Sequence, residues 1–289
     1  MRGEPEIIRL PLSVEKLQTH EMQTARETTN YVYHLYGDEE FFWTEAFYSI
    51  GTLLKKIEPR NSRVIVFTDQ PARLGSLPVL CENIAGEIDK MKGPHGYGYR
   101  VKLCSILKCA EAFPGNIFYL DCDTIVTGKI SELAAQLANG RAFMYRREKL
   151  AGRFPQFEGF QMQFPDGSNY KYGAEACMFN AGVIALQRED AKFLKTALAI
   201  CDALLREKRI NHVCEQFAVS EALRISGLKI LEADKVVAHY YRSSAKKFMH
   251  DRFSKFNAQL KNEPWNFDRP IPYSYPRVQA AKLRRKFFP

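Results

Sequence analysis

Short apolar segments alternate with stretches of helical periodicity along most of the chain. The segments YVYHLY (31–36), SRVIVFTD (62–69) and IFYL (117–120) each have the length and composition of a buried strand. Between the second and the third, VKLCSILKCAEAF (101–113) carries its apolar residues at helical spacing. Strands that are apolar on both faces and alternate with helices are typical of a parallel sheet covered by helices. The pattern predicts an α/β fold with a mostly parallel central sheet flanked by helices.

The same alternation continues through the second half of the chain. We expect a strand within GAEACMFNAGVIALQ (173–187) and a final strand at KVVAHYY (235–241). Asp38 and Asp190 precede helical patterns and are expected to cap the helices that follow them. The segment from Tyr145 to Gly173 is rich in Phe, Tyr, Gln and Gly and is interpreted as a functional loop. The expected helices span residues 39–57, 101–113, 190–208 and 214–226.

Length and composition are those of a globular protein. The chain has 289 residues, of which 46% are hydrophobic and 26% charged, enough for one large domain or two small ones. We expect an N-terminal extension (1–28), a main domain (29–260) and a basic C-terminal tail (261–289). No apolar run has the length of a membrane span, and the first residues lack the apolar core of a secretory signal. A cytoplasmic location is therefore expected. The chain has seven cysteines and no Cys-x-x-Cys pair, so we expect free thiols.

The net charge of +9 is compatible with nucleic acid, an anionic membrane surface or a phosphate-rich ligand as partner. The last residues, RVQAAKLRRKFFP (277–289), combine basic and aromatic side chains without any acid. Such a terminus suits contact with an anionic membrane surface, which would make the protein peripheral at the inner membrane face. The alternative is a solvated tail, and both interpretations remain open.

Two acids, Asp121 and Asp123, directly follow the apolar segment at 117–120. In open α/β sheets, ligands bind at the carboxyl ends of the strands. Strand alternation would put the two side chains on one face, roughly 7 Å apart along the strand. Two neighbouring carboxylates favour a cation, and oxygen ligands suit Mg²⁺ or Mn²⁺, which keep positions open for phosphate oxygens. The other interpretation is that one acid merely caps the next turn.

Four segments carry a resemblance to a known group of enzymes. FYLDCDTIVTG (118–128) resembles the Asp-x-Asp segment of nucleotide-sugar-dependent glycosyltransferases with the GT-A fold, and MFNAGVIAL (178–186) is similar to the Phe-Asn-Ala-Gly-Val segment of glycosyltransferase family 8. That family contains glycogenin and bacterial lipopolysaccharide glycosyltransferases. CEQFAVSEAL (214–223) and VVAHYYRSSAKK (236–247) resemble its acidic-Gln segment and its late metal-binding strand. The resemblance covers residues 30 to 250 in fragments.

This resemblance departs from the family pattern at two places. Glu215 stands where the family usually has Asp, and the second Asp of that segment is absent. The segment after His239 lacks the family's Gly and its Lys-Pro-Trp. The chain therefore resembles a divergent branch of the family.

The resemblance implies a role for each matching residue. Asp121, Asp123 and His239 would bind Mn²⁺ or Mg²⁺. The implied catalytic residues, near the donor sugar, are Asn180, Glu215 and Gln216. The implied substrate-binding residues are Leu35, Tyr36, Gly37, Asp69, Arg100, Lys102, Ala181, Gly182, Lys246 and Lys247.

Each of these roles has a purely structural alternative. His239 could be a hydrogen-bonded strand-end residue, Asn180 a turn residue, and Glu215 part of a helix surface. Lys246 and Lys247 could belong to a solvated basic face. Cys122 lies between the two acids and is interpreted as a packing residue.

The resemblance implies an activity as well. The chain would move a sugar from a nucleotide-diphosphate sugar, with UDP the expected nucleotide, to the hydroxyl of a glycan, lipid-linked or protein acceptor. Retention of anomeric configuration is the family's outcome; an inverting enzyme would need a base such as Glu215 or Asp166.

Three other functions stay open. One is an inactive glycosyltransferase-like binding protein, against which the intact Asp121, Asp123 and His239 argue. A sugar-nucleotide nucleotidyltransferase would normally show a Gly-rich loop, which LYGDEEFF (35–42) is not. A basic nucleic-acid-binding protein would normally show a recognised binding motif, and none is present, so no nucleic acid partner is expected.

Overall fold

The computed structural model describes residues 28–75, 77–137, 140–150, 154–209 and 212–260. The predicted N-terminal extension, apart from Thr28, and the predicted basic tail lie outside these residues. None of the helices in the described ranges is long and apolar enough to cross a membrane.

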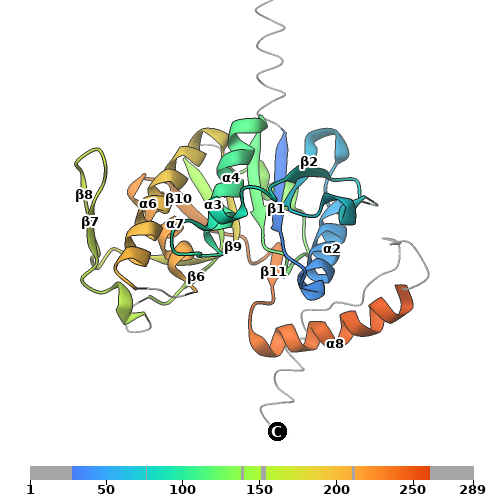
Figure 1. Ribbon diagram of the computed structural model, residues 1–289. Coiled ribbons are helices and arrows are strands. Elements are labelled where there is room, and N and C mark those ends of the chain that lie inside the picture. Colours follow the sequence, from blue (N-terminus) through green and yellow to red (C-terminus); the bar gives the residue numbers. More distant parts are fainter. Residues whose placement is uncertain (1–27, 76, 138–139, 151–153, 210–211, 261–289) are drawn as a thin grey trace, which may run out of the picture.

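Seven strands form the central sheet (Figure 1). In their order across the sheet they are β10 (Lys229–Glu232), β6 (Arg141–Glu148), β9 (Met178–Leu186), β4 (Asn116–Leu120), β1 (Thr29–Leu35), β2 (Ser62–Thr68) and β3 (Leu80–Asn83). The pairs β1–β2, β1–β4, β2–β3 and β6–β10 are parallel, whereas β9 runs antiparallel to both β4 and β6. The prediction of a mostly parallel sheet is confirmed.

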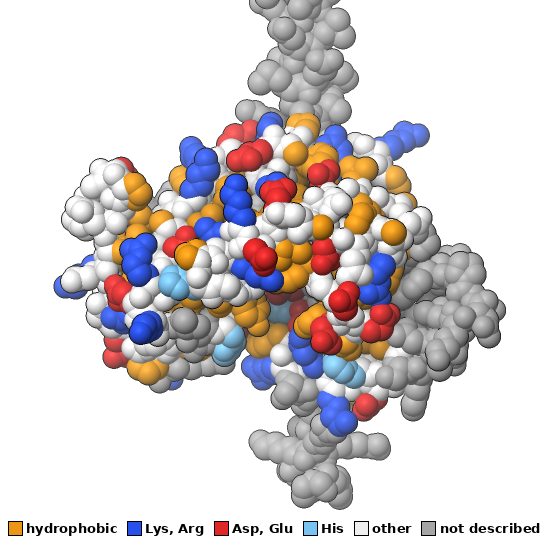
Figure 2. All heavy atoms as spheres, viewed as in Figure 1, with side chains coloured by type: hydrophobic (Ala, Val, Ile, Leu, Met, Phe, Trp, Pro, Cys, Tyr) orange, Lys and Arg blue, Asp and Glu red, His pale blue; other side chains and the backbone are white. Residues whose placement is uncertain are grey.

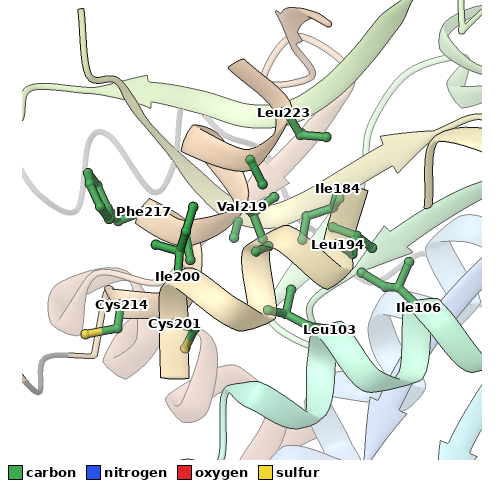
Figure 3. Packing of buried hydrophobic residues seen from close by; sticks show 14 of the residues in the cluster. Leu103, Ile106, Ile184, Leu194, Ile200, Cys201, Cys214, Phe217, Val219 and Leu223 are labelled. Atoms are coloured by element: carbon green, nitrogen blue, oxygen red, sulfur yellow. The ribbon is translucent and has the colours of Figure 1, made fainter. Parts of the chain in front are cut away.

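Alternate side chains of the strands enter two separate cores. In β1, Val32 faces one core, and Tyr31 and Tyr33 face the other. The first core is closed by α4 (Arg100–Ala112), α6 (Phe193–Arg206) and α7 (Cys214–Ile225), which pack on one another and on β9, as Figure 3 shows. The second core is closed by α2 (Glu40–Leu54) and α5 (Ile130–Ala134). All nine residues of β9 are buried because helices or neighbouring segments cover both faces of the sheet.

A second, two-stranded sheet lies beside the main one. It pairs β5 (Thr124–Val126) with β11 (Val237–His239) in antiparallel orientation. The strand expected at 235–241 is present but shorter than predicted, and it lies outside the main sheet. Its partner is the short strand that follows the two acids. The helix α8 (Ser243–Leu260), which the sequence analysis did not identify, packs Met249 and Phe253 against this pair and α2.

The segment from 145 to 173 is more ordered than a loop. It contains the end of β6, the short 3₁₀ turn Pro155–Phe157, and a hairpin of β7 (Gln161–Gln163) and β8 (Asn169–Lys171) that stands away from the body in Figure 1. Phe157 is fully buried and stacks on Phe217 of α7, with ring centroids 4.1 Å apart. The aromatic side chains that suggested a functional loop anchor the segment to the core instead.

Neither predicted helix cap is present. Glu39 occupies the N-cap position of α2 without a side-chain hydrogen bond, and Asp38 accepts one from Gln70 at 2.9 Å. Asp190 lies inside a 3₁₀ turn (Arg188–Lys192), so α6 begins at Phe193. The remaining short elements are α3 (Ile88–Lys92) and the 3₁₀ turns Pro59–Asn61 and Pro71–Leu74.

Candidate functional site

The two acids lie in a turn at the carboxyl end of β4. The strand ends at Leu120, and the Asp121 amide donates to the Gly182 carbonyl oxygen of β9 at 2.9 Å. The chain then turns through Cys122 and Asp123 before β5 begins. The acids are therefore brought together by a turn, not by the strand alternation that the sequence suggested. The Thr124 hydroxyl fixes this turn by donating to the Asp121 carbonyl oxygen at 2.7 Å.

His239 completes a cluster with these acids. It is the last residue of β11, and the pairing of β11 with β5 places it opposite Thr124. Its Nε2 lies 2.9 Å from Asp123 Oδ1 and 3.7 Å from Asp121 Oδ2. One ligand atom from each of the three residues lies within 4.8 Å of the other two, so the cluster could hold a metal ion. Two carboxylates and one imidazole are a ligand set that suits Mn²⁺ and Mg²⁺ sites with further open positions.

Asn180 determines which nitrogen of His239 faces the acids. Its Oδ1 accepts the Gly182 amide at 3.0 Å and lies 2.8 Å from His239 Nδ1. Because an amide oxygen only accepts, Nδ1 must carry a proton, so Nε2 is the nitrogen that faces the acids. An oriented second nitrogen of this kind is the usual partner of a metal-ligating histidine.

Gly182 is required by the position of the His239 ring. A Cβ built at Gly182 would overlap the imidazole, with Nδ1 and Cε1 as its nearest atoms. No larger residue fits there unless His239 moves. The glycine of the Asn-Ala-Gly segment thus has a steric explanation in this chain.

Lys102 of α4 is a buried counter-charge to this site. Its Nζ lies 3.0 Å from Asp121 and 3.2 Å from Glu215, and it donates to the Ala181 carbonyl oxygen at 3.1 Å. Burial alone would lower the pKa of Lys102, but the two carboxylates outweigh it and raise the pKa above its ordinary value. Burial raises the pKa of Glu215, and the charge of Lys102 opposes that rise. Lys102 was predicted as a substrate contact; it links α4, β9 and α7 under the site.

A second lysine pairs with the other acid. Lys246 of α8 places its Nζ 3.0 Å from Asp123 Oδ2. Burial disfavours ionisation of Asp123, but the charges and hydrogen bonds of His239 and Lys246 outweigh it and hold the pKa of that carboxyl well below its ordinary value. Asp123 is therefore a carboxylate at neutral pH.

Tyr119 and His34 extend the network behind Asp121, and the sequence analysis identified neither. The Tyr119 hydroxyl donates to Asp121 Oδ1 at 2.7 Å and lies 2.7 Å from His34 Nδ1, which must then be the donor of that contact. Burial lowers the pKa of His34 to about 4, so its ring is neutral at pH 7. Tyr119 precedes Asp121 by two residues, and residues at this spacing in a strand lie on the same face. This spacing could have identified Tyr119 as a neighbour of Asp121.

Glu45 of α2 is a further acid that the sequence analysis did not single out. Its side chain is buried, and its Oε1 has no hydrogen-bond partner within the described part of the chain. Burial, with Asp123 nearby, raises the pKa of Glu45 to about 8. A helix of mostly apolar residues gave no sequence signal that Glu45 faces a site.

These groups line one cavity of about 540 Å³. Figure 2 shows a hollow near the centre of this face, with basic and acidic side chains around it. Phe42 and Tyr99 lie at the cavity and are 45% and 48% exposed. Twelve of the sixteen predicted site residues are in its lining: Leu35, Tyr36, Lys102, Asp121, Asp123, Asn180, Ala181, Gly182, Glu215, Gln216, His239 and Lys246.

The other four predicted site residues are not among the lining residues. Arg100 forms an ion pair with Asp202 at 2.8 Å. Asp69 accepts the Gly37 amide at 3.1 Å, so these two residues fix the end of β1. Lys247 is exposed.

Asp166, the alternative base, lies in the turn between β7 and β8 and is not among the residues that line the cavity. It is exposed and accepts hydrogen bonds from the amide and hydroxyl of Ser168.

Among the comparisons with known proteins, the one with solved structures gives matches. No protein-family model matches the chain, and no curated protein matches it. Among solved structures, the chain is similar to the glycosyltransferase GlyE of Streptococcus pneumoniae TIGR4, with 13% sequence identity and a TM-score of 0.47. The match covers 89% of this chain and 60% of the GlyE chain.

Proposed function

We propose that this chain is a metal-dependent glycosyltransferase that moves a sugar from a nucleotide-diphosphate sugar to an acceptor hydroxyl. The observation that carries the proposal is the cluster of Asp121, Asp123 and His239, which opens into the cavity at the carboxyl ends of β1 and β4. Ligands of open α/β sheets bind at this edge. The resemblance to glycosyltransferase family 8 adds UDP as the expected nucleotide and retention as the expected outcome.

The residues present fit Mn²⁺ or Mg²⁺. Asp123 is ionised, Asn180 directs Nε2 of His239 towards the acids, and the three ligand atoms are close enough to share one ion. When bound, such an ion would act as a Lewis acid towards the diphosphate leaving group.

Side chains of the chain itself would position the donor. Lys246 lies on the cavity wall with a charged ammonium that can interact with phosphate oxygens. Glu215 and Gln216 line the same cavity from α7, and we assign to them, with Asn180, the proposed role of contacts near the reacting sugar. Lys102 fixes Glu215 through their ion pair, so the position of this carboxylate does not depend on substrate. A rigid group of this kind stabilises developing charge without reorganisation.

A binding titration with UDP, with and without Mn²⁺, tests the proposal. We expect UDP binding that requires the metal, followed by metal-dependent hydrolysis of at least one member of a panel of sugar nucleotides. Conversion of the sugar nucleotide and added pyrophosphate into a nucleoside triphosphate and a sugar 1-phosphate would instead identify a nucleotidyltransferase. Binding of an oligonucleotide that is independent of Mn²⁺, with no UDP binding, would contradict both enzyme assignments.

The Asp123→Ala variant gives the first mutational prediction. It removes one proposed ligand and leaves Lys246 and His239 without their acid, so we expect metal-dependent hydrolysis to fall by at least about 100-fold. The measurement is initial rate at saturating Mn²⁺, with circular dichroism to show that the fold is retained. Asp89→Asn, which changes an acid with a fully exposed side chain, is the matched control. Wild-type turnover in Asp123→Ala would remove the acid pair from the mechanism.

A further inference from the structure

We infer that the Lys246 ammonium exchanges between two acids: it pairs with Asp123 while the cation site is empty and with Glu45 once a divalent cation binds. The inference rests on the metal site of the proposed function. It assigns to Glu45 a positioning role that neither the sequence pattern nor the comparisons suggest.

Both carboxylate oxygens of Asp123 have a neighbour in the present arrangement. Oδ1 is 2.9 Å from His239 Nε2, and Oδ2 is 3.0 Å from Lys246 Nζ. His239 is itself a proposed ligand and would remain beside the cation. Lys246 is therefore the neighbour that competes with a cation for Asp123.

Electrostatics gives the same answer. An ammonium and a divalent cation on one carboxylate repel each other strongly, because burial weakens the screening between them. Asp123 is 8% exposed and fixed in a turn, whereas Lys246 has a flexible side chain that is about one-third exposed. The Lys246 side chain can therefore move, whereas the Asp123 side chain is fixed.

Glu45 is placed to receive the displaced ammonium. It is 1% exposed, it lines the cavity that Lys246 also lines, and its Oε1 lacks a hydrogen-bond partner among the described residues. Burial and Asp123 favour the protonated form of Glu45, whereas Lys246 and the Tyr240 hydroxyl favour its carboxylate. The approach of the ammonium would therefore stabilise the ionised form, and the Glu45 proton would leave to solvent. A buried oxygen without a partner is costly unless another state of the protein supplies one, and Lys246 supplies that partner in the metal-bound state.

The exchange makes opposite predictions for the two residues. Lys246→Met removes the competitor for Asp123, so we expect Mn²⁺ to bind about 10-fold more tightly, a difference of about 1.4 kcal/mol. Glu45→Gln removes the receiving acid with little change in shape, so we expect Mn²⁺ to bind about 10-fold more weakly. In the Lys246→Met background there is no ammonium for Glu45 to bind. Glu45→Gln should then change the Mn²⁺ affinity by less than about threefold.

The experiment is a titration of the full chain with Mn²⁺ alone at pH 7. Electron paramagnetic resonance measures the concentration of the free ion at each step. Four proteins are compared: wild type, Lys246→Met, Glu45→Gln and the double variant. Thermal unfolding of each confirms the fold, and Lys246→Gln replaces Lys246→Met if the latter does not fold. Lys247→Met changes the neighbouring exposed lysine and should leave the Mn²⁺ affinity unchanged.

Three results would overturn the exchange. Unchanged or weaker Mn²⁺ binding by both Lys246 variants means that Lys246 does not compete for Asp123. An equal loss from Glu45→Gln in both backgrounds means that Glu45 attracts the cation directly. Absence of Mn²⁺ binding in all four proteins removes the site itself. Failure of the proposed glycosyltransferase activity is a separate result, because this titration contains no sugar nucleotide.

Discussion

At the residue scale, the site is a buried set of charges that compensate each other in pairs. Lys102 pairs with Asp121 and Glu215, and Lys246 pairs with Asp123. Ion pairs of this kind lose much of their Coulomb energy to desolvation, so they are better evidence of function than of stability. Lys102 holds two acids of the site in position, while Lys246 occupies the place where a cation would bind.

Gly182→Ala tests the contact between β9 and His239. The added methyl group overlaps the imidazole, so we expect His239 to move and Mn²⁺ affinity to fall by at least about 10-fold. The measurement is a Mn²⁺ titration. Gly86→Ala is the control, because a Cβ at Gly86 meets no atom within 4 Å. Equal Mn²⁺ affinity in Gly182→Ala and wild type would show that the ring position does not matter for the metal.

His34→Gln tests the buried neutral histidine behind Tyr119. The folded pKa of about 4 lies below the ordinary histidine value of about 6.5, so between these two pH values the unfolded chain binds a proton that the folded chain does not. The contribution of His34 to stability is thus complete above pH 6.5 and is lost as pH falls towards 4. Urea unfolding at pH 4.5 and pH 7 should show a smaller loss of stability on acidification in His34→Gln than in wild type. An identical loss would mean that His34 takes up its proton in the folded state.

The sequence predicted the cluster of two acids and one histidine better than its surroundings. Asp121, Asp123 and His239 form one cluster, as the resemblance implied. The role of Lys102 as an ion-pair partner and the presence of Glu45 in the cavity could not be predicted, because each depends on how a helix is rotated against the sheet. Helical spacing gives the buried stripe but does not show which polar residue at its edge faces a site.

At the element scale, the β5–β11 pair is the feature that builds the site. The expected strand at 235–241 pairs with the short strand after the acids and not with the main sheet, and α8 packs against this pair. Periodicity identified the central strands β1, β2, β4 and β9 and the helices α2, α4, α6 and α7, since each carries a buried face, but it missed β6 and α8. It did not identify β3, β5 and β10, which have only three or four residues each.

Phe157→Ala tests how the segment after β6 is anchored. Phe157 is fully buried against Phe217, so its truncation should lower the free energy of unfolding by about 3–5 kcal/mol. Chemical denaturation measures the change. Ile225→Ala, at a side chain that is 41% exposed, should cost less than about 1 kcal/mol. A similarly small cost for Phe157→Ala would mean that the segment is not held by this stack.

At the scale of the whole molecule, the described site does not account for the net positive charge. The chain carries a net charge of +9, while the described site balances its acids with lysines. The basic and aromatic residues at 277–289 lie outside the described residues, so their contact with an anionic membrane surface stays a prediction.

Deleting residues 277–289 tests that prediction. Removal of five basic residues should reduce association with vesicles that contain phosphatidylserine, and the association of the full chain should weaken as salt increases. Co-sedimentation measures both effects, and neutral phosphatidylcholine vesicles are the control. Equal partitioning of the full and shortened chains would identify a solvated tail.

The sequence separation within the candidate site has a consequence for folding. Asp123 and His239 are 116 positions apart, and they meet only when β11 has paired with β5. Contacts between such distant residues form late, because a long loop must close before they contribute. A ligand that binds only the completed cluster stabilises the native state by an amount that grows with the logarithm of its concentration above Kd. Protection of the full chain from proteolysis by Mn²⁺ would therefore report the last docking step of folding, and a chain that ends before Val237 would gain no such protection.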